Sequence, residues 1–130
     1  MIVRTHDAVW HLISQPDHAA LARRVMERWG PLHDAQRPGS ILLAVEEHDN
    51  GWREPDAALT LDPATGPVLD FVHVAAEVRQ GVWPRGVGRL AEDDPWAAAL
   101  VAHHAVTVYD RFRGDPAWAD FFPRLEHLRD

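Results

Sequence analysis

One stretch of the sequence decides the fold: DPWAAALVAHHAVTVYDRF, residues 94–112. Asp94 is a residue type that caps helices, and Pro95 suits the first helical position. The segment from Trp96 to Phe112 is apolar almost all round, and Gly114 ends it. Because a helix without a polar face is buried on most sides, we expect this helix to run through the core of a mainly α-helical protein.

The segments on either side predict more helices and one small hairpin. Residues 2–4 and 9–13 look extended and predict a short N-terminal β-hairpin. Apolar periodicity, with proline and glycine at the ends, predicts helices over residues 16–29, 40–49, 70–80, 83–92 and 115–128. Residues 53–69 are rich in turn formers and predict a long surface loop. A chain of 130 residues fits one domain with one core, so we expect residues 1–130 to form a single domain.

Composition excludes several classes of function. The net charge is −7 and no basic stretch stands out, which argues against nucleic-acid binding. The chain has no cysteine, so any metal must use nitrogen and oxygen ligands. All 13 basic residues are arginine, so no lysine can act as a Schiff base or general base. With abundant alanine, this composition is typical of a GC-rich bacterial genome.

The N-terminal sequence lacks the apolar core of a signal peptide. No apolar run is long enough to span a membrane. We therefore expect a cytoplasmic protein with no membrane partner.

Histidines lie on the apolar faces of three predicted helices. His18 shares a face with Leu21, Ala22 and Val25, His48 with Ile41, Ala44 and Val45, and His104 with Leu100, Val101 and Val108. Asp49 borders the same apolar stripe as His48. Burying an unpaired carboxylate is costly, whereas a metal cation compensates its charge, so the cluster predicts a metal site. A hydrogen-bonded polar core without metal remains the alternative.

The candidate metal ligands are His18, His48, Asp49 and His104. Adjacent residues on a helix point about 100° apart, so His48 and Asp49 do not share a face, but both can reach an ion that lies between their directions. His103 and Asp110 are alternatives to His104 as the ligand from the late helix.

Other polar residues near the His-Asp pair are candidates for the chemistry. Glu47 or Glu46 is the candidate proton acceptor, and Asp49 belongs to the catalytic group as well as to the ligands. Trp52 follows the pair and is either a pocket wall or a plain packing residue. The arginines that could hold an anionic substrate are Arg53, Arg79, Arg85 and Arg89.

Over nearly its full length the chain resembles a family of small uncharacterised bacterial proteins, the domain of unknown function 3891 family. The matching stretches are Ile2-Val3-Arg4, Gln15-Pro16-Asp17-His18-Ala19, His48-Asp49-Asn50-Gly51-Trp52, Leu61-Asp62-Pro63-Ala64-Thr65-Gly66, and Trp96 to His104. More broadly, a histidine on one helix and a His-Asp pair on the next resemble the HD-domain superfamily of helical proteins. Many of these are metal-dependent phosphohydrolases. The resemblance implies an HD-domain-like helical bundle with His18 as the first histidine and His48-Asp49 as the name-giving pair.

Two departures from the superfamily pattern concern the chemistry. The superfamily usually closes its site with an aspartate on a late helix, where the best match in this chain is His104. Many HD enzymes also place a lysine after the glycine of the motif, where this chain has Trp52. Both departures argue against the usual phosphohydrolase chemistry and leave the metal site in place.

The favoured hypothesis is a metal-dependent, phosphohydrolase-like hydrolase that acts on a small molecule through a metal-activated water. The cofactor would be a divalent zinc, manganese or iron ion, and an anionic substrate is one option. The alternatives are an HD-type iron-dependent oxygenase and a non-catalytic metal-binding or structural domain. The pattern leaves open whether the chain forms a homodimer.

Overall fold

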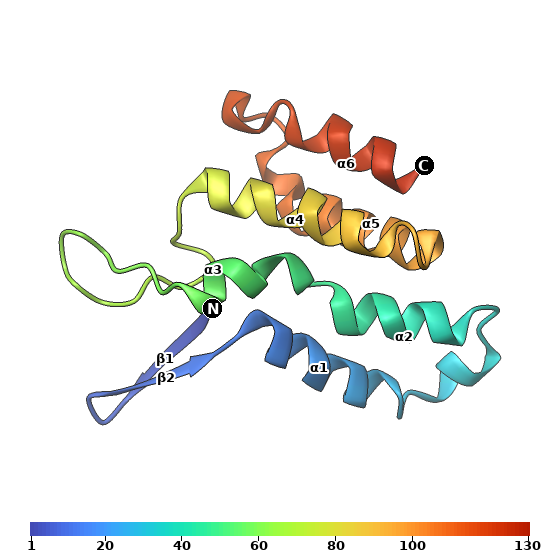
Figure 1. The fold of residues 1–130 in the computed structure, drawn as a ribbon, viewed down its shortest axis with the longest axis horizontal. Helices are drawn as coiled ribbons and strands as arrows, with labels where there is room; N and C mark the ends of the chain where they lie inside the picture. The colour runs from blue at the N-terminus through green and yellow to red at the C-terminus, as the bar shows by residue number, and fades with distance from the viewer.

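In the computed structural model, which describes residues 1–130, the chain opens with a β-hairpin and is otherwise helical (Figure 1). Strands β1 (Ile2–His6) and β2 (Val9–Ile13) pair antiparallel, with Ile2 opposite Ile13. The helices are α1 (Gln15–Met26), α2 (Pro38–Glu47), α3 (Arg53–Ala57), α4 (Ala76–Leu90), α5 (Pro95–Tyr109) and α6 (Phe121–Arg129). The predicted mainly α-helical fold with a short N-terminal hairpin is therefore confirmed.

Helices α1 and α2 lie side by side and hold the first two candidate ligands (Figure 1). Helix α1 begins after Ser14, whose hydroxyl oxygen accepts a hydrogen bond from the backbone N–H of Asp17 at 3.1 Å. It ends at Met26, before the predicted end at residue 29. Helix α2 begins at Pro38, so Ser40 lies inside its first turn and does not cap it.

Helix α4 corrects the prediction of two helical pieces separated at Gly81. It runs without interruption through Gly81 and Pro84. An internal proline costs roughly 3 kcal/mol because it removes a hydrogen bond and crowds the preceding turn. Burial of one continuous face outweighs this cost; that face includes Val82, Trp83, Val87 and Leu90.

Helix α5 is the central helix, as its sequence predicted. It packs against α2, α4 and α6. Its buried positions are mostly small, which lets the neighbouring helices approach closely; they are Ala97, Ala98, Val101, Ala102, Ala105, Val106 and Tyr109. None of the helices is both long and apolar enough to cross a membrane.

The predicted helix over residues 115–128 is broken into two parts. A 3₁₀ turn at Pro116–Trp118 comes first, and α6 begins at Phe121. The Trp118 ring stacks on Phe112 at a centroid distance of 4.7 Å and on Tyr109 at 4.9 Å. These contacts fix the turn against the end of α5, so the chain changes direction before α6 starts.

Asp94 is expected to contribute to stability as the N-cap of α5. Its carboxylate accepts a hydrogen bond from the backbone N–H of Ala97 at 2.9 Å. Asp94→Ala should lower the thermal unfolding midpoint by a few degrees, because the N–H loses its partner. The preceding exposed residue supplies a matched control, Asp93→Ala, which should leave the midpoint unchanged in a circular-dichroism melt. Equal midpoints for the two variants would contradict a capping role.

Candidate metal centre

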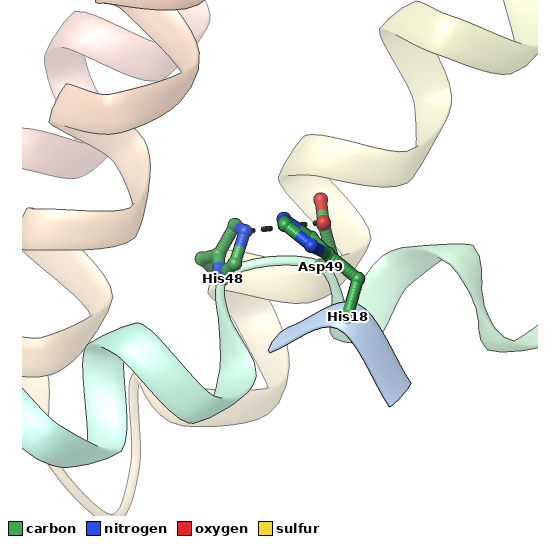
Figure 2. Close-up of side chains that lie close together, drawn as sticks. All are labelled: His18, His48 and Asp49. Atoms are coloured by element: carbon green, nitrogen blue, oxygen red, sulfur yellow. Dashed lines mark ion pairs between the residues drawn. The ribbon is translucent and has the colours of Figure 1, made fainter. Parts of the chain in front are cut away.

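Three of the candidate ligands converge where α1 and α2 pack against each other. His18 lies in the first turns of α1, and His48 is the C-terminal cap of α2. Asp49 leaves the helical conformation, with φ −106° and ψ 15°. This break brings two adjacent side chains toward one point. The ligand atoms of His18, His48 and Asp49 all lie within 4.8 Å of one another, and Figure 2 shows them gathered between the helices.

The turn that carries Asp49 is anchored to α4. The Asn50 side-chain amide donates to the carbonyl of Gly86 at 3.2 Å. Arg89 donates to the carbonyl of Asn50 at 2.7 Å, and Arg85 donates to the carbonyl of Gly51 at 3.1 Å. These contacts hold a buried 3₁₀ turn, Asn50–Trp52, directly after the ligand pair. The position of the Asp49 carboxylate is therefore set by packing between distant segments.

The first turn of α1 is anchored as well. Asp56 in α3 accepts a hydrogen bond from the backbone N–H of Gln15 at 2.6 Å and pairs with the amino group of Met1. His18 lies one turn further along the same helix. The hairpin, α1 and α3 are thereby joined beside the ligand group.

His48 makes two contacts that define its chemistry. Its Nδ1 lies 2.7 Å from the carbonyl oxygen of Val45, and its Nε2 lies 3.1 Å from Oδ2 of Asp49. Because a carbonyl can only accept, Nδ1 carries a proton and donates it. Neutral His48 then points the Nε2 lone pair at a carboxylate oxygen. Two acceptors at this distance repel each other unless a proton or a metal cation lies between them.

The pKa values of the neighbouring imidazoles shift in opposite directions. Burial alone would lower the pKa of His48, but the hydrogen bond and charge of Asp49 and the Val45 carbonyl outweigh it and raise that pKa. Burial and the positive charge of His48 lower the pKa of His104. Of the two imidazoles, His48 is therefore the one whose protonation the site favours.

His104 lies beside the group of three and outside it. Its ring centroid is 5.1 Å from that of His48, and the two rings are nearly perpendicular at 85°. Its ring also packs on that of Trp83, at a centroid distance of 5.6 Å. The structure thus brings His104 to the edge of the site, and its role as a fourth ligand stays a prediction.

The other candidates lie away from the ligand group. Glu47 pairs with Arg53 at 2.8 Å, and Glu46 pairs with Arg23, so both carboxylates are engaged elsewhere. His103 is exposed.

The predicted arginines are also occupied or distant. Arg85 and Arg89 pair with Glu54, and the Arg79 guanidinium lies over the Phe112 ring. Asp110, the other alternative to His104 as the ligand from the late helix, pairs with Arg113 at 3.1 Å.

A cavity of about 370 Å³ opens beside the ligand group. Its walls come from the hairpin, α1, the end of α2 and the turn after it, the loop before α4, α4 and α5; they are Ile2, Arg4, Gln15, His18, His48, Asp49, Trp52, Phe71, Trp83, His104, Val108 and Tyr109. Trp52 is therefore a wall of the cavity, and only 2% of it is exposed. The one arginine in the lining is Arg4, which the sequence did not single out.

Gln15 is a second residue of the cavity that sequence reasoning missed. It is 4% exposed, and its Oε1 has no hydrogen-bond partner. The signal was present in the sequence, because residues three apart share a helix face and Gln15 lies three positions before His18. A buried amide oxygen without a donor is costly, so it fits a site where a donor from a ligand completes the bond.

The donor set suits a divalent metal ion. Two imidazoles and one carboxylate match the nitrogen and oxygen ligands that zinc, manganese and iron take in proteins. The hydrogen bond from Nδ1 of His48 to a backbone carbonyl is the arrangement that usually orients a metal-binding histidine. Three protein ligands leave positions for water or substrate, whereas structural sites are closed by four.

Comparison with known proteins gives a family and no close relative. Neither a curated protein nor a solved structure matches this chain. A family model matches residues 1–130, and its description is "Protein of unknown function (DUF3891)". With its whole length covered by that model, the chain belongs to this family of proteins of unknown function.

Proposed function

We propose that the protein is a metal-dependent hydrolase of a small molecule. His18, His48 and Asp49 would hold a divalent zinc, manganese or iron ion. When bound, such an ion lowers the pKa of a water molecule and polarises the bond to be cleaved. The observation that carries the proposal is the distance of 3.1 Å between Nε2 of His48 and Oδ2 of Asp49, with Nδ1 already committed to Val45.

The residues of the cavity have separate tasks in this proposal. The Val45 carbonyl holds the His48 ring in place through Nδ1, which leaves Nε2 as the nitrogen that would bind the ion. Arg4 would bind an anionic group of the substrate, in place of the arginines that pair with Glu54 and Glu47. Gln15 would accept a hydrogen bond from the substrate or its water. A volume of about 370 Å³ lies in the range of small-molecule sites, roughly 300–1,000 Å³.

The HD-domain resemblance supports the same proposal. A histidine in α1 and a His-Asp pair at the end of α2 lie together in a helical protein, as that resemblance implies. The late-helix position is His104, and the position after the glycine is the buried Trp52. These differences favour a hydrolase whose substrate contacts differ from those of enzymes that use a lysine.

An iron-dependent oxygenase is the second candidate, and one observation favours it. Two histidines and one carboxylate are the donor set of the non-haem iron oxygenases, in which the open positions take oxygen and substrate. Anaerobic loading with Fe²⁺ followed by exposure to air distinguishes the two candidates. Oxygen consumption would favour the oxygenase; hydrolysis that proceeds equally without oxygen would favour the hydrolase.

The hydrolase proposal is tested with purified protein loaded separately with Zn²⁺, Mn²⁺ and Fe²⁺. On a panel of small phosphoesters and other hydrolysable esters, we expect turnover that chelation abolishes. Asp49→Asn should lower it by at least about 100-fold, because the ligand charge is lost. Asp110→Asn, at an exposed aspartate outside the site, is the control and should retain full activity. A metal-loaded protein that hydrolyses nothing on the panel would count against the proposal.

A further inference from the structure

Two neighbouring apolar hollows lie beside the candidate metal centre, and together they are called the groove. The proposed metal chemistry gives these apolar residues no role. One hollow of about 790 Å³ lies along α1 and reaches α2 at Val45. A second hollow of about 340 Å³ lies between α2 and α5 and includes Val45 as well. The two hollows meet at this residue of α2, which packs against both α1 and α5.

The groove leads directly to the candidate metal ligands. His18 lines the α1 hollow, and His48 and His104 line the α2–α5 hollow. From His18 the apolar lining continues along α1 to Met26, a distance of roughly 12 Å at 1.5 Å per residue. Trp29, after the end of the helix, extends the lining further. The histidines therefore stand at one end of an elongated apolar surface.

The lining of the groove is almost free of charge. Apart from the histidines and Arg28, every residue that lines the two hollows is apolar. On the α1 wall the exposed fractions are 60% for Leu21, 65% for Val25 and 55% for Trp29. A contiguous patch of this kind on a soluble protein usually binds something apolar.

We propose that the groove holds the hydrocarbon part of an amphiphilic substrate, whose polar group lies at the metal centre. This inference rests on the proposed function, because it assigns the apolar end of the same substrate. Continuity with the ligand group argues for this occupant, since a chain lying along α2 would end beside His48. The absence of acidic residues from the lining fits an uncharged tail, and each buried methylene adds binding energy.

The test compares two probes, decyl phosphate below its micellar concentration and inorganic phosphate. Binding to the zinc-loaded protein is measured by isothermal titration calorimetry. We expect decyl phosphate to bind at least about 100-fold more tightly than inorganic phosphate. Leu21→Glu should reduce this ratio to about tenfold or less while leaving the affinity for inorganic phosphate unchanged. Leu128→Glu, at an exposed leucine of α6 outside the groove, is the control and should keep the ratio of the wild type.

Three outcomes would overturn the groove assignment. The first is a ratio of the two affinities near one in the wild type, and the second is an unchanged ratio in Leu21→Glu. The third is a wild type that light scattering shows to be dimeric while Leu21→Glu is monomeric, because a second copy of the chain would then cover the groove.

Decanol, measured on the chelated protein, separates this inference from the proposed function. Binding of decanol that Leu21→Glu weakens supports the groove even if no hydrolysis is found. Metal-dependent hydrolysis with equal affinity for the two phosphate probes would support the function and overturn the groove.

Discussion

Replacing His48 with alanine is expected to abolish stoichiometric binding of zinc, manganese or iron. The variant loses Nε2, the nitrogen that faces the Asp49 carboxylate at 3.1 Å. His18 and Asp49 remain, and two ligands on separate segments hold an ion far more weakly than three. We expect the affinity to fall by more than about 100-fold, beyond the 10–100-fold typical for residues that only orient a ligand. Metal content after dialysis, measured by mass spectrometry, gives the result directly.

The thermal unfolding midpoint gives a second measure of the same loss. An ion that binds only the folded state stabilises it by about 2.7 kcal/mol at one hundred times its dissociation constant. Added zinc should therefore raise the midpoint of the wild type and leave that of His48→Ala unchanged. His103→Ala is the matched control, because His103 is an exposed histidine of α5 outside the ligand group, and it should behave like the wild type. Equal metal content in His48→Ala and the wild type would refute the metal centre.

The metal content of a His104→Ala variant tests whether His104 is a fourth metal ligand. A loss of metal as large as that of His48→Ala would make His104 the fourth ligand. Full retention of metal would leave it as a wall of the cavity that packs on Trp83. Either result changes the number of positions that remain for water and substrate, and so it bears on the reaction that the ion can support.

The parts of the fold that the sequence predicted are those set by local patterns. The hairpin follows from short extended runs, and α5 follows from its cap and its apolar surface on all sides. The His-Asp pair and His18 were likewise predicted because each histidine repeats the helical spacing of its apolar neighbours. The structure places His18, His48 and Asp49 together. The apolar face of α1 that carries His18 is nevertheless exposed at Leu21 and Val25, so burial of that face is not what brings His18 to the group.

The parts that sequence reasoning missed depend on contacts between distant segments. Gly81 suggested the end of one helix and Trp83-Pro84 the start of another, yet α4 runs through both because its buried face packs on α5 and on the turn after α2. Arg4 reaches the cavity only because the hairpin folds beside α1, and no spacing within the hairpin reveals that. Glu47 directly precedes the His-Asp pair in the sequence and was a candidate proton acceptor, but in the structure its carboxylate pairs with Arg53.

Gly51 is another residue whose role depends on a contact between distant segments. In the sequence it suits the end of a helix, but in the structure it lies in a 3₁₀ turn pressed against α4. A Cβ atom at this position would lie 1.9 Å from the carbonyl oxygen of Val82 and 2.7 Å from its carbonyl carbon. Both atoms belong to the backbone of a helix and cannot rotate away. Glycine is therefore required at position 51, because the backbone of the turn lies too close to the backbone of α4 for a Cβ atom to fit.

Gly51→Ala is therefore expected to destabilise the protein by about 3 kcal/mol or more, since the turn and α4 must separate. The separation would also weaken the contacts of Asn50 and Arg89 that hold the turn after Asp49, so metal affinity should fall in the same variant. Gly81→Ala is the matched control. Gly81 lies in α4 beside Val82, and a Cβ there would meet nothing within 4 Å.

In Gly81→Ala the only change is the better helix propensity of alanine, which should stabilise the protein by about 0.5–1 kcal/mol. The two variants thus make the same chemical substitution, one inside the contact between the turn and α4 and one outside it. Chemical denaturation should give changes in stability of opposite sign. A Gly51→Ala protein as stable as the wild type would mean that the turn and α4 do not meet at this distance. The anchoring proposed for Asp49 would then lose its physical basis, while a destabilised variant that still binds metal normally would show that the ligand pair is held by α1 and α2 alone.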